Sequence, residues 1–293
     1  MKIGLGTAQF GMDYGISNRE GKTDVAEVVR ILTAASESGI RVLDTASAYA
    51  KSEAVLGDVL SPSLPFSIVT KTPPVTVDVI TEREIENVSS AFYSSLEKLG
   101  QKSIYGLLVH QADRLLVEGG WKIFDQMQAF KKSGLVSKIG VSVYDRVTLD
   151  RILDRFPLDL IQIPLNVFDQ RMLANNYLAN LKKAGIEIHA RSAFLQGLLL
   201  MEPDKLPAHF SSIIDHVRSY RSYLAVHEIS PLEAALGFVL SLNEVDVVLC
   251  GVNNLDQLVE IVEVAGRSKV DFADFRDFAL TDERIINPSL WNV

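Results

Sequence analysis

The chain has 293 residues, a formal net charge of −8 and 47% hydrophobic residues, which is the composition of a globular protein and not of a disordered one. Its acidic balance, with a pI near 5.2, argues against nucleic acid and anionic membranes as partners, because both bind basic surfaces. The N-terminal "MKIGLGTAQFG" lacks the apolar region of a signal peptide, and no stretch approaches the ~20 apolar residues of a membrane span. We therefore expect a cytoplasmic protein.

The cysteine content argues against disulfides within the chain and against a structural zinc site. Cys250 is the only cysteine, so no disulfide can form within the chain, and no Cys/His cluster has the spacing of a structural zinc site. Its setting in "VVLCGV" predicts a buried strand residue.

Short apolar runs bounded by turn residues recur along the chain and predict strands. They are "KIGLGT" from Lys2, "RVLDT" from Arg41, "FSIVTK" from Phe66, "YGLLVH" from Tyr105, "KIGVSV" from Lys138, "LIQIPL" from Leu160, "EIHARS" from Glu187 and "VVLCGV" from Val247. Segments with helical spacing lie between them, including those that begin at Thr23, Arg83, Gln170, about Ser211 and about Pro231. Glycines 39, 100, 134 and 185 follow the last turns of predicted helices.

The alternation of apolar strands and helices predicts parallel pairing through right-handed crossovers. Eight such units predict a single (β/α)8 TIM barrel over residues 1–293. A doubly wound sheet is the rival fold, but "GLGTAQFG" lacks the G-x-G-x-x-G spacing of a phosphate loop. The last segment, from Arg267 to Val293, either folds over the barrel as a partial lid or packs on outer helices.

Polar side chains stand at three successive strand ends, where the chemistry of such barrels is found. Asp44 ends the second strand and Tyr49 follows in its loop, Lys71 ends the third strand, and His110 ends the fourth. Each has an ordinary structural explanation taken alone, but together they predict an active site.

These four residue types suit proton delivery to a carbonyl oxygen. The ammonium of Lys71 is expected to lower the pKa of the Tyr49 phenol, and Asp44 to keep Lys71 charged and oriented. His110 is expected to hydrogen-bond the substrate oxygen. Because none of these side chains is a hydride donor, a nicotinamide cofactor must supply the reducing equivalents.

The motifs "GLGTAQFG", "DTASAYAKSEAVLG", "IVTKT", "LLVHQAD", "KIGVSV" and "LIQIPLN" occur in the order seen in the aldo-keto reductase superfamily, so the chain resembles that family over nearly its whole length. The resemblance implies an NAD(P)H-dependent carbonyl reductase acting on a small-molecule aldehyde or ketone. It implies that Asp44, Tyr49, Lys71 and His110 form a catalytic tetrad, with Tyr49 as the general acid.

The resemblance also implies a cofactor site. Its residues would be Gly6, Thr7, Asp44, Ser142, Gln162, Arg191, Ser192, Phe194, Leu195, Gly197, Gly251, Asn253, Gln257 and Glu260. Ser142 and Gln162 would hold the nicotinamide carboxamide, the segment from Ser192 the pyrophosphate, and the segment from Gly251 the adenosine. No metal is implied.

The chain departs from the family at five positions. Val143 replaces a common asparagine beside the carboxamide, and Arg191 replaces the aromatic ring that stacks on nicotinamide. Gly251, Val252 and Gln257 stand where 2′-phosphate-specific members place Lys, Ser and Arg. NADP(H) is the expected cofactor by resemblance, and NAD(H) is the alternative because no cation remains at those positions.

Three alternatives are weighed against a reductase. A cofactor-binding sensor or partner-binding subunit on the same barrel would keep the fold with slow chemistry. A metal-dependent hydrolase would need further ligands beside His110, and a serine hydrolase would need a G-x-S-x-G elbow, which is absent. The physiological substrate and the oligomeric state do not follow from the sequence, although polar residues after Met12 favour a hydroxylated or sugar-like carbonyl.

Overall fold

The computed structural model describes residues 1–61 and 64–291, and it contains a closed barrel of eight parallel strands. The strands are β1 (Ile3–Gly6), β2 (Val42–Asp44), β3 (Ser67–Lys71), β4 (Ile104–Val109), β5 (Val136–Ser142), β6 (Leu160–Pro164), β7 (Glu187–Arg191) and β8 (Val247–Gly251). Each strand pairs with its neighbours in sequence, and β1 closes the barrel on β8. The eight strands and the TIM-barrel fold expected from the sequence are confirmed.

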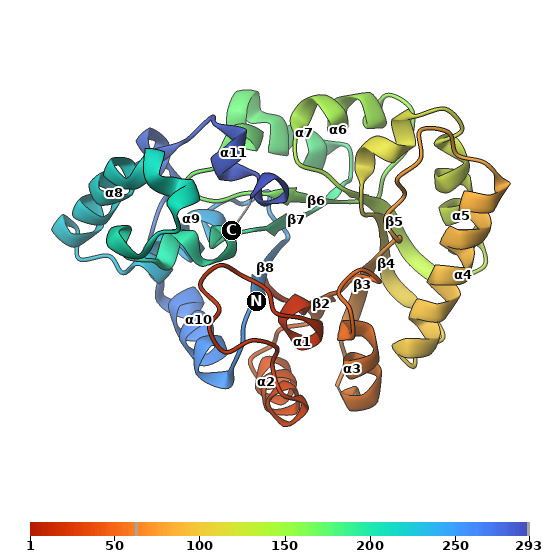
Figure 1. Ribbon diagram of the computed structural model, residues 1–293, viewed down its shortest axis with the longest axis horizontal. Coiled ribbons are helices and arrows are strands. Elements are labelled where there is room, and N and C mark those ends of the chain that lie inside the picture. The colour runs from red at the N-terminus through yellow and green to blue at the C-terminus, as the bar shows by residue number, and fades with distance from the viewer. Residues whose placement is uncertain (62–63, 292–293) are drawn as a thin grey trace.

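Helices surround the strands as an outer ring (Figure 1). They are α1 (Ala8–Gly11), α2 (Val25–Glu37), α3 (Ser52–Val59), α4 (Glu82–Lys98), α5 (Trp121–Lys132), α6 (Arg146–Leu153), α7 (Tyr177–Lys183), α8 (Ile214–Val226), α9 (Pro231–Leu240), α10 (Leu255–Arg267) and α11 (Glu283–Ile286). Short 3-10 helices cover Ala112–Leu116, Arg171–Asn176, Leu195–Leu200, Pro203–Lys205, Ala208–Ile213, Phe272–Phe278 and Pro288–Leu290. Within the described ranges no single helix is long and apolar enough to cross a bilayer, and only 208–226 taken with α9, bent by 90°, reaches that length.

The helix boundaries follow from local chemistry. Thr81 and Glu84 form a capping box at the start of α4, which satisfies N–H groups that the first turn leaves free. Gly39 and Gly185 adopt positive φ of 81° and 79° after α2 and α7, a conformation that glycine takes without steric cost.

One predicted helix is divided. The sequence predicts a continuous helix from Gln170, but the structure has the 3-10 helix Arg171–Asn176 followed by α7. Asn175 and Asn176 stand at φ of 57° and 53°, in the left-handed region that asparagine tolerates best among residues with a Cβ atom. The two asparagines therefore break the helix that the apolar spacing favours.

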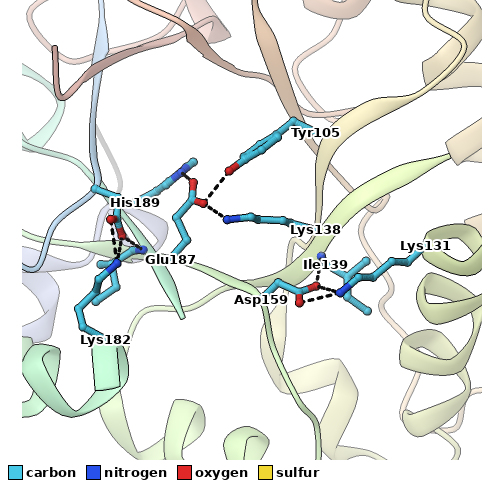
Figure 2. Close-up of polar contacts among 10 residues, drawn as sticks. Tyr105, Lys131, Lys138, Ile139, Asp159, Lys182, Glu187 and His189 are labelled. Carbon is cyan, nitrogen blue, oxygen red and sulfur yellow. Dashed lines mark hydrogen bonds and ion pairs between the residues drawn. The ribbon is translucent and has the colours of Figure 1, made fainter. Parts of the chain in front are cut away.

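The floor of the barrel, at the amino ends of the strands, carries paired charges (Figure 2). Asp159 precedes β6 and accepts hydrogen bonds from Lys131 of α5 at 2.7 and 2.6 Å and from the main chain of Ile139 at 2.9 Å. Asp246 precedes β8 and accepts from Lys182 of α7 at 2.8 and 2.6 Å and from a β7 main-chain N–H at 2.7 Å. In both cases an aspartate before a strand accepts hydrogen bonds from a lysine of a helix and from the main chain of the neighbouring strand.

A second floor cluster centres on Glu187, the first residue of β7. Its carboxylate accepts hydrogen bonds from Tyr105 at 2.6 Å and from Lys138, and pairs with Nε2 of the fully buried His189 at 2.7 Å (Figure 2). Burial alone would raise the pKa of Glu187, but the bonds from His189, Lys138 and Tyr105 outweigh it and lower the pKa to about 2. Charged groups at this end of a barrel serve stability.

The C-terminal segment both packs on outer helices and reaches the barrel mouth. Phe275 and Phe278 pack edge to face against Tyr220 and Tyr223 of α8, so this part lies on outer helices. Further on, Pro288 and Ser289 reach the rim of the large cavity at the barrel mouth. Residues 292 and 293 lie outside the described part.

Candidate active site

Asp44 and Lys71 form a buried ion pair at the carboxyl ends of β2 and β3. Nζ of Lys71 donates to both carboxylate oxygens of Asp44, at 2.8 and 2.7 Å, and to the main-chain oxygen of Thr45 at 2.8 Å. Gln162 on β6 donates from Nε2 to Oδ1 of Asp44 at 2.7 Å. All three protons of the ammonium are therefore engaged within the protein.

Tyr49 is held at the mouth by a tightly packed turn. The main-chain N–H of Ser52 bonds to the carbonyl of Tyr49 at 2.9 Å, and the Ser52 hydroxyl joins Thr7 Oγ1 at 2.8 Å. Gly11 of α1 lies so close that an added Cβ would stand 2.1 Å from the Tyr49 carbonyl oxygen. The glycine is needed because any side chain there would displace the Tyr49 loop.

The rings of Tyr49 and His110 meet at right angles. Their centroids lie 6.1 Å apart with planes at 86°, and Nζ of Lys71 lies 5.0 Å from the centroid of the Tyr49 ring. Lys71 thus faces the phenol ring as a nearby charge and has no hydrogen bond to its hydroxyl within the described chain. The four residues expected to act together do lie together.

The electrostatics of Tyr49 differ from the sequence-based expectation. Burial and the negative charge of Asp44 raise its pKa above the usual 10.0, and Arg191 opposes this in part. Lys71 itself has a lowered pKa because of burial, although its pairing with Asp44 works against that shift. The expected lowering of the Tyr49 pKa was wrong for this state, because burial first and the negative charge of Asp44 second raise it.

His110 is a neutral histidine. Burial first and the nearby charge of Lys71 second lower its pKa to about 4. Its Nδ1 is enclosed and has no hydrogen-bond partner, so the ring nitrogen left for a ligand is Nε2. At neutral pH the residue can donate a hydrogen bond to a carbonyl oxygen but carries no positive charge.

A cavity of about 1240 Å³ opens above these side chains. The catalytic candidates Asp44, Tyr49, Lys71 and His110 all line it, as do Gly6, Thr7, Ser142, Gln162, Arg191, Ser192, Phe194, Gly197, Gly251, Asn253, Gln257 and Glu260. Leu195 is the exception among the sequence candidates. Its side chain is fully buried in the hydrophobic core, where it packs under the loop and does not face the cavity.

The loop after β7 has an unusual backbone. Ser192, Leu195 and Gln196 take positive φ of 61°, 47° and 53°, and Gly197 takes 95°. Residues other than glycine adopt this conformation at a cost of ~1–3 kcal/mol, and such strain gathers at ligand-binding segments. The strain lies where the sequence predicts a pyrophosphate.

Arg191 stacks on a tyrosine of the neighbouring rim. Its Cζ lies 4.0 Å from the centroid of Tyr144, which follows the end of β5. The guanidinium makes only long hydrogen bonds, at 3.4 Å to Ser192 Oγ and 3.5 Å to the carbonyl of Val143, and its Nε has no partner. Sequence reasoning missed Tyr144; its position directly after "KIGVSV" was the only signal.

The far end of the cavity is closed by contacts between loops. Asn253 donates from Nδ2 to Oδ1 of Asn18 at 2.5 Å, and its main-chain N–H donates to Oε1 of Gln257 at 2.8 Å. The Ile16 N–H bonds to the carbonyl of Gln196 at 3.1 Å. The segment between α1 and α2 therefore reaches across to the loops after β7 and β8, a contact that sequence reasoning did not find.

Comparison with known proteins agrees with this geometry. The Aldo/keto reductase family model matches residues 2–278. A search of curated proteins found no match.

Solved structures share the fold. The holo form of the aldo-keto reductase AKR11C1 from Bacillus halodurans superposes with a TM-score of 0.74 and 19% identity, over 94% of this chain and 90% of that one. The glycerol dehydrogenase AKR11B4 from Gluconobacter oxydans gives 0.67 and 22%, over 97% and 88%. A putative aldo-keto reductase from Pseudomonas aeruginosa, PA4992, gives 0.66 and 22%, over 90% and 89%.

The family match spans nearly the whole chain, and the family carries out NAD(P)H-dependent reduction of carbonyl compounds. Together with the closed barrel and the charged mouth, it assigns this chain to the aldo/keto reductase family.

Proposed function

We propose that this protein reduces an aldehyde or ketone to an alcohol with NAD(P)H, and that Tyr49 is the general acid. The observation that carries the proposal is the meeting of Asp44, Lys71, Tyr49 and His110 at the mouth of one large cavity. A carboxylate, a lysine, a phenol and a histidine from three successive strand ends all face the same cavity, an arrangement that is not expected by chance.

The chain's own groups divide the work. The Tyr49 hydroxyl gives its proton to the carbonyl oxygen as the alcohol forms, and Nε2 of His110 donates a hydrogen bond to the same oxygen. Lys71 lies 5.0 Å from the phenol ring and favours the phenolate that this transfer leaves behind. Asp44 holds Lys71 in place, and Gln162 in turn donates a hydrogen bond to Asp44.

The cavity residues fit a nicotinamide dinucleotide, which supplies a hydride when bound. Ser142 and Gln162, which line the cavity, would hold the carboxamide, the strained loop of Ser192 to Gly197 would hold the pyrophosphate, and Asn253 with Gln257 would hold the adenosine end. NADP(H) is the expected cofactor and NAD(H) the alternative. Among the described residues, the cavity lining includes the acidic Glu20 and Glu260, and its lysine and arginine residues are Arg19, Lys71 and Arg191.

A cofactor-binding sensor with slow chemistry is the second candidate. The raised pKa of Tyr49 favours it, because a phenol that holds its proton tightly is a weak acid. Two measurements separate the candidates: binding of NADPH and NADH followed by fluorescence, and carbonyl-dependent oxidation of each cofactor with a panel of aldehydes, ketones and sugars. Tight binding without oxidation on any panel member would favour the sensor, and oxidation supports the reductase.

A further inference from the structure

The cavity that opens at Tyr49 extends to the start of helix α10. Asn253, Gln257 and Glu260 line it there, together with Glu20 from the segment between α1 and α2. This end of the cavity is the one assigned above to the adenosine half of the cofactor. NAD(H) and NADP(H) differ only in that half, by one phosphate on the 2′-oxygen of the ribose. The groups around the start of α10 therefore decide which of the two is bound.

The first turn of α10 is capped by the protein's own groups. The start of a helix attracts anions because its first N–H groups lack partners within the helix. The N–H of Leu255 donates to Oε1 of Glu27 at 2.6 Å. The N–H of Gln257 donates to Oδ1 of Asn254 at 3.0 Å. Glu27 belongs to α2, which packs beside α10 (Figure 1), and its other oxygen pairs with Arg30 at 2.8 Å. A phosphate that approached the Leu255 N–H would have to displace a carboxylate that is held from both sides.

A second carboxylate faces the same turn from the segment between α1 and α2, residues 12–24. The oxygens of Glu20 lie 3.3 and 3.5 Å from Nδ2 of Asn254, and Glu20 lines the cavity. Because these contacts are long, both oxygens keep the capacity to accept shorter hydrogen bonds from a ligand. The segment is tied to α10 by bonds from Asn253 Nδ2 to Asn18 at 2.5 Å and from the Thr23 hydroxyl to the Asn253 carbonyl at 3.1 Å. The fold therefore places the Glu20 carboxylate at the cavity wall.

Negative charge prevails around the start of α10. Glu20 and Glu260 line the cavity, and Glu27 stands behind them at the first turn of the helix. Arg19, next to Glu20 in the sequence, is the lining cation on the same segment. A 2′-phosphate would bring about −1.5 to −2 further charge at pH 7 and would be repelled by this surplus. The hydroxyls of an unmodified ribose are uncharged, and each has a proton to donate to a carboxylate.

We propose that this protein selects NAD(H) over NADP(H), and that Glu20 and Glu27 make the selection. Glu20 accepts hydrogen bonds from the hydroxyls of the adenosine ribose, as acidic residues do in other NAD sites. Glu27 keeps the Leu255 N–H from a 2′-phosphate. This inference rests on the proposed function, because it assumes that the cavity takes a nicotinamide dinucleotide. It reverses the order expected from the resemblance to the family, where NADP(H) comes first.

The test measures binding and needs no turnover. Calorimetry at matched ionic strength compares adenosine 5′-monophosphate with adenosine 2′,5′-bisphosphate, which differ only by the 2′-phosphate, and fluorescence compares NADH with NADPH. The unmodified protein should bind the member without the 2′-phosphate at least about tenfold more tightly in both pairs. 2′-Deoxyadenosine 5′-monophosphate should bind more weakly than adenosine 5′-monophosphate, because it lacks a hydroxyl that donates to Glu20.

Two isosteric variants remove the charges one at a time. In Glu27→Gln the amide oxygen still accepts the Leu255 N–H, so α10 keeps its first turn. Glu20→Gln and Glu27→Gln should each narrow the preference about three- to tenfold, and the double variant should bind the two members of each pair about equally. Glu86→Gln, at an exposed position of α4, makes the same change in net charge and should leave the preference unchanged.

The outcomes separate this inference from the reductase function. Tighter binding of NADPH than of NADH would overturn the inference and leave carbonyl reduction standing, and loss of that preference in Arg19→Gln would assign the 2′-phosphate to Arg19. A preference for NADH that is unchanged in both glutamate variants would equally overturn it. Selective binding of NADH without oxidation by any carbonyl compound would support the inference and contradict the reductase function. Binding of neither dinucleotide would overturn both.

Discussion

Lys71 directs all three of its ammonium hydrogen bonds to Asp44 and Thr45, and none to Tyr49, whose ring centroid lies 5.0 Å from its Nζ. The lysine therefore acts on the phenol through its charge and not through a shared proton. Because Asp44 offsets much of that charge, the influence of the lysine depends on the pair as a whole.

Lys71→Met tests this coupling. The variant leaves Asp44 charged and unpaired beside Tyr49, so the pKa of the phenol should rise further and kcat/KM should fall at least ~tenfold, the equivalent of one pKa unit. Breaking a buried pair from one side costs ~3–5 kcal/mol in unfolding free energy, whereas the double variant Asp44→Asn/Lys71→Met should recover most of it. Urea unfolding and a pH profile of kcat/KM give both quantities. A Lys71→Met profile identical to that of the unmodified protein would contradict the coupling.

His110 predicts a pH dependence on the acid side. Its pKa of about 4 lies below the usual 6.5, so it stays neutral from pH 8 down to about 4 and carbonyl reduction should show no histidine step near 6.5. Between pH 6.5 and 4 the unfolded chain binds the proton that the folded chain refuses, so unfolding free energy should fall as the pH is lowered through this window. His110→Gln should reduce that slope. A titration of the His110 ring by NMR checks the pKa, and a value near 6.5 would refute the assignment.

Cofactor choice is a separate prediction. Gly251, Val252 and Gln257 offer no cation to a 2′-phosphate, and Oε1 of Gln257 is already bonded to the Asn253 N–H at 2.8 Å. We expect a preference for NADPH over NADH below ~100-fold in kcat/KM, because the charge-assisted bonds that produce larger preferences are missing. Gln257→Arg should move the ratio toward NADPH, and Gln101→Arg on a distant loop is its control. A thousandfold preference for NADPH in the unmodified protein would mean that other basic residues hold the phosphate.

Much of the fold was predictable because its signals are local. Runs such as "LIQIPL" are apolar throughout, as strands buried on both faces must be, and glycines such as Gly185 mark helix ends. The division of the helix from Gln170 was not predictable, since apolar spacing continues through Asn175 while the backbone changes hand. Asparagine tolerates the left-handed conformation but does not require it, so the residue type alone did not mark the break.

Some features of the site follow from sequence position, and others depend on contacts between residues far apart in the sequence. Asp44, Tyr49, Lys71 and His110 could be chosen because strand ends converge in a barrel. The pKa of Tyr49 could not be predicted from the sequence, because it depends on burial and on the charge of Asp44, which is paired with Lys71. The stacking of Arg191 on Tyr144 joins two strand ends 47 residues apart, for which the sequence holds no spacing signal.

The floor cluster gives a prediction about stability alone. The pKa of Glu187 is lowered to about 2 from 4.5, so its carboxylate stabilises the fold fully above pH 4.5, and this contribution is lost as the pH falls toward 2. Glu187→Gln should reduce unfolding free energy at pH 7 by ~1–3 kcal/mol, with a smaller difference at low pH. The exposed Glu86→Gln is the matched control. Because Glu187 lies at the opposite end of the barrel from the mouth, kcat/KM should stay unchanged, and a large loss of turnover in a folded variant would contradict this reading.

The most direct test of the account is a single-turnover measurement on Tyr49→Phe, with the reduced cofactor bound beforehand and an aldehyde added in excess. The variant keeps the aromatic ring and removes only the hydroxyl, so cofactor affinity should stay within about twofold while the rate of cofactor oxidation falls ~10²–10⁴-fold. Tyr93→Phe, on the exposed face of α4, is the matched control and should react at the normal rate. Oxidation of the bound cofactor by Tyr49→Phe at close to the normal rate would contradict the assignment of Tyr49 as the proton donor.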